Sequence, residues 1–143
     1  MSTQSFADLG VSRAVTAALS ERGITKPFAI QNLVVADVLA GRDVLAQSPT
    51  GSGKTLAFGV PMVDMIESTD QRPAALVLAP TRELVSQIVD EIRPLAHARA
   101  LKIASVYGGV GLQKQAREAA RAQLIIATPG RLEDLLERGA FSL

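Results

Sequence analysis

From residue 43 onward, the chain alternates short apolar runs with longer segments of helical periodicity. The runs cover residues 43–47, 74–79, 102–106 and 123–128, and they are apolar almost throughout. Strands that alternate with helices are typical of βαβ units, and near-continuous apolar strands are typical of a parallel sheet with helices on both faces. The pattern therefore predicts an α/β fold with a parallel sheet and flanking helices.

Two helical patterns precede the first of these runs. Residues 11–21 place apolar side chains on one face, and a second pattern begins after Pro27 and ends at Gly41. We therefore expect a helical extension over residues 1–41 and the α/β domain over residues 42–143. We expect the extension and the domain to form one structural unit.

The composition excludes several classes of protein. The 143 residues carry a net charge of +1 and include no cysteine, so disulfides and thiolate metal sites are not available. No apolar run approaches the roughly 20 residues of a membrane span, and the N-terminus lacks a signal-peptide pattern. We expect a cytoplasmic protein with no membrane partner. Any polyanion must be held by local groups, because the overall charge is close to neutral.

The segment 48–55, SPTGSGKT, joins the first apolar run to a helical pattern. A strand, a glycine-containing loop and a helix in this order indicate a phosphate-binding P-loop. Gly51 and Gly53 allow successive backbone N–H groups to point toward phosphate oxygens. Lys54 would reach the β- and γ-phosphates, and the Thr55 hydroxyl would ligate Mg²⁺. A glycine-rich turn followed by a solvated lysine is the simpler alternative.

Ser48 stands where the usual P-loop pattern has glycine. This position lies at the strand exit, before the phosphate cradle, so a small residue should suffice there. The residues predicted to bind the phosphates are Ser48, Pro49, Thr50, Gly51, Ser52, Gly53, Lys54 and Thr55.

A nucleotide site also needs groups that recognise the base. The stretch 23–31, GITKPFAIQ, ends in Gln31, whose amide has a donor and an acceptor side by side and can pair with N6 and N7 of adenine. Phe6 could supply a stacking face. Taken alone, however, the stretch is better explained as a helix start after Pro27 with Gln31 in solvent.

Together these segments resemble the DEAD-box RNA helicase family. Phe6, GITKPFAIQ and SPTGSGKT occur in the order and spacing of that family's aromatic residue, Q motif and motif I. PTRELVSQ at 80–87 resembles motif Ia, and TPGR at 128–131 resembles the family's TPGR element. Gly108 and Gly109 resemble its GG motif. The resemblance covers essentially the whole chain.

The resemblance implies a RecA-like P-loop NTPase domain that binds ATP and Mg²⁺. It implies Gln31 as the reader of adenine, with Phe6 and Lys26 also at the nucleotide and Thr55 on the metal. Two positions depart from the family pattern, because Phe28 replaces a common threonine and Ile24 replaces a common aromatic residue. We expect these departures to change the packing beneath the adenine.

The resemblance also implies RNA as a partner. Motifs Ia, GG and TPGR each follow a predicted strand, and the carboxyl ends of parallel strands meet at one sheet edge, where ligands bind in such folds. Arg82 and Arg131 would clamp a phosphodiester backbone without reading bases. For any one junction, a threonine that caps a helix and an arginine in a surface ion pair are the simpler alternative. The residues predicted to contact RNA are Pro80, Thr81, Arg82, Glu83, Gly108, Gly109, Thr128, Pro129, Gly130 and Arg131.

The family's Asp-Glu-Ala-Asp strand, its Ser-Ala-Thr motif and its second RecA-like domain have no counterpart in these 143 residues. P-loop enzymes hold Mg²⁺ jointly through the P-loop hydroxyl and a strand-end aspartate. We therefore expect an N-terminal part of an ATP-dependent RNA helicase that binds nucleotide but hydrolyses ATP negligibly by itself. We also expect unpaired sheet edges, which favour partial disorder or self-association.

Two other functions are compatible with the P-loop. The chain could be a small nucleotide kinase or another ATPase, although GITKPFAIQ and PTRELVSQ would then have no role. It could also be a non-catalytic module that binds RNA or protein and keeps a vestigial P-loop.

Overall fold

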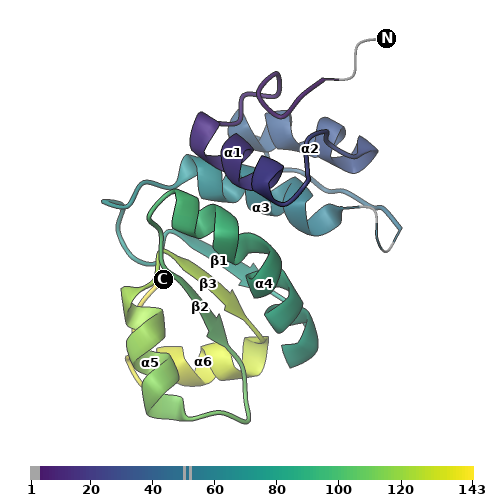
Figure 1. The fold of residues 1–143 in the computed structure, drawn as a ribbon. Helices are drawn as coiled ribbons and strands as arrows, with labels where there is room; N and C mark the ends of the chain where they lie inside the picture. The colour runs from purple at the N-terminus through teal and green to yellow at the C-terminus, as the bar shows by residue number, and fades with distance from the viewer. Residues whose placement is uncertain (1–3, 50, 52) are drawn as a thin grey trace. The chain divides into compact units, whose positions relative to one another are not determined.

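The computed structural model describes residues 4–49, 51 and 53–143 (Figure 1). It divides into two compact units, Met1–Met65 and Ile66–Leu143. The described part of the first unit contains helices α1 (Arg13–Glu21), α2 (Ala29–Leu39) and α3 (Lys54–Met65). The second unit contains β1 (Ala75–Leu78), α4 (Arg82–Ala98), β2 (Ile103–Val106), α5 (Leu112–Arg121), β3 (Leu124–Ala127) and α6 (Pro129–Glu137).

The first unit is built by three helices that bury apolar faces against one another. Helix α3 packs along α2 and also contacts α1. Val15 and Leu19 of α1 and Val60 of α3 are completely buried. At the start of α1, the Ser12 N–H donates a hydrogen bond to Asp64 Oδ1 of α3 at 3.1 Å. The sequence pattern predicted a domain boundary between residues 41 and 42. In the structure, α2 before this boundary and α3 after it lie in the same compact unit.

The strand predicted over residues 43–47 is absent from the structure, and this prediction is wrong. The segment has no regular secondary structure, and its Leu45 side chain is fully exposed. A strand is stable only when a neighbouring strand satisfies its backbone N–H and C=O groups. In the described part of the chain, the sheet strands all lie after residue 74 and pair only with one another, so segment 43–47 has no partner.

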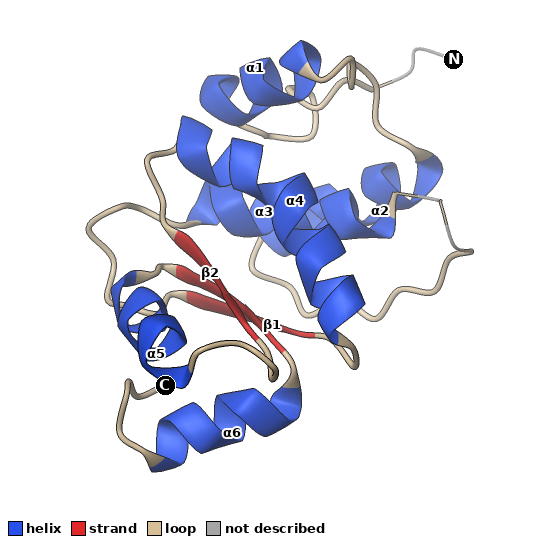
Figure 2. Ribbon diagram, turned by 60° about the horizontal axis from the view of Figure 1, so that its bottom comes forward, coloured by secondary structure: helices blue, strands red, loops and turns tan. Residues whose placement is uncertain are grey.

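The second unit contains the predicted parallel sheet, in the order β1-β3-β2 (Figure 2). Ala75 of β1 and Ile103 of β2 both align with Leu124 of β3, and both pairings are parallel. Each strand lies within one or two residues of its predicted range. The central strand β3 is the most buried of the three, because all four of its residues are buried.

Helices cover both faces of this sheet. Helix α4 packs on one face, where it contacts β2 and β3, while α5 and α6 lie on the other (Figures 1 and 2). On the second face, Ala104 and Ile125 of the sheet pack against Ala119 of α5 and Leu135 of α6. At the amino end of the strands, the buried Gln123 accepts a hydrogen bond from the Lys102 N–H at 2.7 Å and donates to the Ser68 carbonyl at 3.2 Å.

Within the described residues, the helices are all too short or too polar to cross a membrane.

Candidate functional site

Gln31 is one of the predicted nucleotide-binding residues that the structure buries. It lies in the first turn of α2 and is buried, with a relative exposure of 2%. Its Oε1 accepts a hydrogen bond from the Phe28 N–H at 2.9 Å. Its Nε2 donates to the carbonyl of Gly53 at 3.1 Å. The amide therefore links the start of α2 to the end of the P-loop, and the alternative of a solvated Gln31 is wrong.

These two bonds leave part of the Gln31 amide unused. A glutamine side chain has two N–H donors and two acceptor lone pairs, and among the described residues only one of each is engaged. One N–H and one lone pair remain, which is the number that pairing with N7 and N6 of adenine requires. Phe28 has no side-chain acceptor, so it cannot return a hydrogen bond to the first turn of α2 as threonine could.

Gly53 is required by its surroundings as well as by its backbone. Its φ is +87°, in the left-handed region that favours glycine. A Cβ atom at this position would lie 2.5 Å from Gln31 Nε2 and 2.7 Å from Phe28 Cδ2. Gly51 also has a positive φ, of +81°, but a Cβ there would meet no atom within 4 Å. Of these two glycines, Gly53 therefore lies closer to the Gln31 amide.

Helix α3 begins directly after Gly53, with Lys54 exposed and Thr55 half-buried in its first turn. The Ala57 N–H donates to the Gly53 carbonyl at 3.1 Å, which closes the first helical turn. The first N–H groups of a helix have no intrahelical acceptor and carry partial positive charge, so this end of α3 is suited to a phosphate.

The other predicted nucleotide-binding residues have different surroundings. Phe6 is buried, with 1% exposure, so its ring is covered in this structure and its stacking against a base stays a prediction. Lys26 and Pro49 are exposed, and Ser48 is half-buried. Thr50 and Ser52 lie outside the described residues.

In the second unit, the three predicted RNA-binding junctions lie at the same sheet edge. Leu78, Ala127 and Val106 end their strands in register, so the chain leaves each strand at one level. Helices α4, α5 and α6 begin just beyond this edge. Their N-terminal backbone N–H groups therefore gather at the carboxyl end of the sheet, as the sequence predicted.

Arg82 connects the junction after β1 with the junction after β2. Its guanidinium carbon lies 5.2 Å from the centroid of the Tyr107 ring, a cation–π distance. Its Nη1 would lie 2.8 Å from a Cβ atom at Gly109, whose φ is +88°. In the described part of the chain, Arg82 forms no ion pair with a carboxylate. Its N–H donors are therefore available to a phosphate, and the surface ion-pair alternative is wrong for Arg82.

Arg131 connects the junction after β3 with the loop after β2, which contains Val110. Its Nη1 donates to Gln115 Oε1 at 2.9 Å and to the Val110 carbonyl at 3.3 Å. Gln115 is buried, with 6% exposure, so this bond satisfies an acceptor that water does not reach. Arg131 therefore has a structural function at this edge, which the sequence did not indicate.

The two threonines at this edge differ in capping. Thr81 Oγ1 accepts a hydrogen bond from the Leu84 N–H at 3.2 Å. Thr81 therefore caps α4, which agrees with the simpler alternative that a threonine at such a junction caps a helix. The Thr128 side chain makes no such bond to α6. Pro80, Glu83, Gly108, Pro129 and Gly130 are all exposed at this edge.

Sequence reasoning missed Tyr107 and Gln115. Tyr107 directly precedes the GG motif, and its position beside Arg82 depends on two strands that are separated by a whole helix. Gln115 lies among polar residues of α5, and nothing in its local pattern indicates that it is buried. Within the described residues, no three His, Asp or Glu side chains gather in a way that could hold a metal ion.

Comparisons with known proteins agree on one family. A family model for DEAD/DEAH box helicases matches residues 28–143. The chain is 42% identical over 142 residues to the RNA helicase CrhR of Synechocystis sp., covering 99% of this chain and 29% of that protein. It is 40% identical to the ATP-dependent RNA helicase DeaD of Escherichia coli, covering 96% of this chain and 22% of that protein.

The fold agrees with the same assignment. The crystal structure of a DEAD box protein from Methanococcus jannaschii superposes with a TM-score of 0.91 at 36% identity, covering 97% of this chain and 38% of that one. A hypothetical ATP-dependent RNA helicase from Sulfolobus tokodaii gives a TM-score of 0.83 at 32% identity, with 91% and 38% covered. The chain thus spans less than a third of the curated relatives described above. From its motifs, its sheet and these matches, the chain belongs to the DEAD/DEAH box helicase family.

Proposed function

We propose that this chain supplies the adenine-nucleotide-binding and RNA-binding elements of an ATP-dependent RNA helicase. The observation that carries the proposal is the guanidinium of Arg82, which has no carboxylate partner among the described residues and is held over Tyr107 beside Gly109 at the carboxyl edge of the sheet. A cation fixed among glycines and helix N-termini is suited to a phosphodiester backbone. The family match leaves the nucleotide-kinase alternative without support.

The residues of the first unit fit ATP and Mg²⁺. The Gln31 amide keeps one donor and one acceptor for adenine, and the close approach at Gly53 leaves no space for a side chain. Lys54 would hold phosphate oxygens and Thr55 would ligate Mg²⁺ at the start of α3. In the full-length protein, bound ATP would supply the phosphoanhydride whose hydrolysis drives RNA remodelling. We propose that Phe6 and Lys26 complete this Q-motif site.

The proposed RNA contacts involve the phosphodiester backbone and not the bases. Arg82 and the first N–H groups of α6 would donate to phosphate oxygens, and such contacts carry no sequence information. The Glu83 carboxylate can only accept hydrogen bonds, so it suits a ribose hydroxyl and not a phosphate. A second RecA-like domain of the full-length protein would cover the other side of the RNA.

Nucleotide selectivity tests the first half of this proposal. Fluorescent ADP and GDP are titrated into the 143-residue chain, and we expect ADP to bind more tightly because Gln31 matches adenine. The Lys54→Ala variant should bind both nucleotides more weakly. Equal affinity for ADP and GDP would contradict the assignment of Gln31 as the base reader.

RNA binding and hydrolysis test the second half. The affinity for single-stranded RNA should fall with salt, with a logarithmic slope of about −0.7 for each phosphate contacted. The affinity should depend little on the RNA sequence. We expect no RNA-stimulated ATP hydrolysis above that of the Lys54→Ala variant, and clear stimulation would show that the chain needs no further acidic motif.

We further propose a cytoplasmic location and self-association through an open sheet edge. The absence of cysteine is compatible with a reducing compartment. Strand β1 is an edge strand whose Leu78 side chain is 55% exposed, and exposed edges of this kind pair with other chains. Light scattering should show a mass that rises with chain concentration, and a constant monomer mass would refute self-association.

A further inference from the structure

The opposite edge of the sheet, formed by β2, also presents unpaired backbone groups. Strand β2 pairs only with β3 in the described sheet. The Lys102 carbonyl accepts from the Leu124 N–H at 3.1 Å, and the Val106 carbonyl accepts from the Thr128 N–H at 2.9 Å. Backbone groups alternate along a strand, so the N–H and C=O groups of Ile103 and Ser105 point away from β3, toward the open edge.

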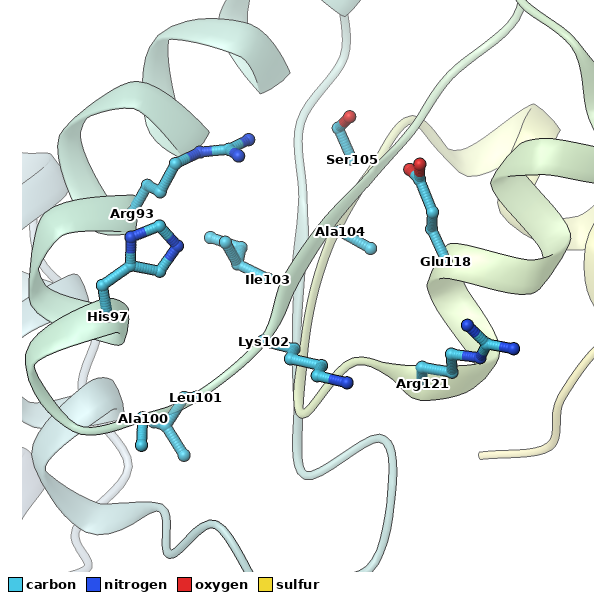
Figure 3. A pocket seen from close by; sticks show the side chains of 10 residues that line it. All are labelled: Arg93, His97, Ala100, Leu101, Lys102, Ile103, Ala104, Ser105, Glu118 and Arg121. Carbon is cyan, nitrogen blue, oxygen red and sulfur yellow. The ribbon is translucent and has the colours of Figure 1, made fainter.

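This open edge lies in a cavity of about 480 Å³. Figure 3 shows Arg93 and His97 of α4 on one side of the strand and Glu118 and Arg121 of α5 on the other. The helices therefore form the walls of a groove, and Ile103 and Ser105 lie along its base. The two walls are formed by α4 and α5, which both pack on β2. The groove therefore follows the direction of this strand.

The groove carries an excess of positive charge. Arg93, Lys102 and Arg121 line it, and in the described residues none of the three forms an ion pair. The single carboxylate of the lining, Glu118, lies 4.0 Å from Lys114 Nζ, so its charge is partly compensated from outside the groove. A negatively charged occupant would therefore gain electrostatically here.

We propose that this groove binds an extended acidic segment of a partner protein, which adds to β2 as a further strand. A peptide backbone supplies both donors and acceptors, and it can pair with the exposed N–H and C=O groups of Ile103 and Ser105. A nucleic-acid backbone supplies phosphate acceptors, which would face the two carbonyls unfavourably. Acidic side chains of the added strand would contact Arg93, Lys102 and Arg121. The proposal does not depend on the RNA site, because the junction proposed to bind RNA follows the carboxyl end of β2, beyond these residues.

A labelled octapeptide of sequence Glu-Glu-Val-Val-Glu-Glu-Val-Val, which presents glutamates on both faces of an added strand, tests the proposal against the 143-residue chain. We expect saturable binding in fluorescence anisotropy and slower hydrogen exchange at the Ile103 and Ser105 amides. The same peptide with N-methyl groups on alternate residues keeps its charge but loses the donors that face the strand. It should bind at least tenfold more weakly, and equal binding would overturn strand addition.

Variants that reverse charges in the groove provide a second test of the proposal. Combining Lys102→Glu with Arg121→Glu should weaken peptide binding at least tenfold. The matched control is Arg117→Glu, because Arg117 is exposed on the same helix but does not line the groove. An equal loss in the control would show general charge attraction and overturn the proposal. Thermal unfolding of all variants identifies any loss of peptide binding that arises from misfolding. The comparison with the N-methylated peptide uses the unchanged chain, so it is not affected by misfolding of a variant.

Two further outcomes would assign the groove to another occupant and overturn the proposal. If a single-stranded RNA protects the Ile103 and Ser105 amides as the acidic peptide does, the groove binds polyanions in general. If these amides become protected as the chain concentration rises without peptide, a second copy of the chain occupies the edge.

Discussion

The Nε2 atom of Gln31 donates a hydrogen bond to the carbonyl of Gly53 at 3.1 Å, and this bond joins the proposed base reader to the P-loop. The same carbonyl accepts from the Ala57 N–H at 3.1 Å, so both of its lone pairs are used. The orientation of the Gln31 amide and the start of α3 therefore depend on one backbone oxygen. We expect changes at either residue to affect recognition of the base and of the phosphates together.

The first prediction compares the two glycines of the loop. Gly53→Ala places a Cβ within 2.5 Å of Gln31 Nε2, so either the amide or the loop must move. Gly51→Ala has similar backbone strain but a free space around the Cβ. We expect Gly53→Ala to reduce ADP affinity at least tenfold more than Gly51→Ala in a fluorescence titration. Equal effects would mean that backbone strain alone governs the loop.

The second prediction concerns the buried amide. Gln31→Ala removes two part-buried hydrogen bonds, from the Phe28 N–H and to the Gly53 carbonyl, which together contribute about 1–3 kcal/mol. The free energy of unfolding in urea should fall by that amount. The exposed Gln47 is the control, and Gln47→Ala should change it by less than about 0.5 kcal/mol. If the two variants unfold alike, the Gln31 bonds do not stabilise the fold.

The third prediction separates the two arginines of the sheet edge. Arg131→Ala leaves the buried Gln115 Oε1 without its donor, so it should lower the free energy of unfolding by about 1–3 kcal/mol. Among contacts with the described residues, Arg82→Ala loses a cation–π contact, which contributes about 0.5–1 kcal/mol at an exposed site.

For RNA affinity, the ranking of the two variants should reverse, because Arg82 is proposed to contact a phosphate directly. Arg82→Ala should reduce single-stranded RNA binding and lower the salt slope by about 0.7, the contribution of one phosphate contact. Arg82→Lys should retain the slope because it retains the charge. An unchanged slope in Arg82→Ala would remove Arg82 from the RNA contacts.

The fourth prediction uses the difference in capping between the two threonines. Thr81→Ala removes the side-chain acceptor of the Leu84 N–H and should destabilise the protein by about 1 kcal/mol. Thr128→Ala removes no such bond and should have a smaller effect. Urea unfolding of both variants measures the difference, and a reversed order would contradict the capping geometry.

The fifth prediction concerns acid stability near the N-terminus. The Ser5 N–H donates to Asp8 Oδ2 at 2.8 Å, and this bond, followed by the Ser5 hydroxyl, lowers the pKa of Asp8 below 3.8. A lowered pKa in the folded state means that the ionised carboxylate stabilises the turn above its unfolded pKa. That stabilisation is lost as the pH falls through the folded pKa. Asp8→Asn should therefore weaken the dependence of stability on pH below about pH 4, and an unchanged dependence would contradict this.

The sheet of the second unit could be predicted from the chain because its signals are local. Residues 74–79, 102–106 and 123–128 are apolar runs separated by helical segments, and such runs form parallel strands. Once the strands are parallel, their carboxyl ends must share one edge. The gathering of Arg82, Gly109 and Arg131 at that edge followed from this geometry without any knowledge of side-chain contacts.

The failed prediction of a strand over residues 43–47 has a different cause. Residues 44–46 are apolar like parts of the true strands, but strand formation also depends on a neighbour that supplies hydrogen bonds. No local pattern states whether such a neighbour exists. The same limit applies to Gln31 and Arg131, since the burial of one and the bond from the other to Gln115 depend on residues distant in sequence.

By itself, the sequence determined the helices, the parallel strands, the glycine positions of the P-loop and the residue types that suit nucleotide and RNA. These features depend on periodicity, backbone freedom and chemistry, which short segments carry on their own. The tertiary structure alone decided that Gln31 bonds to Gly53, that Arg131 is partly structural and that β2 has an open, positively charged edge. Such features depend on which distant groups meet and which are left without a partner, because burial and hydrogen bonding are properties of pairs of segments.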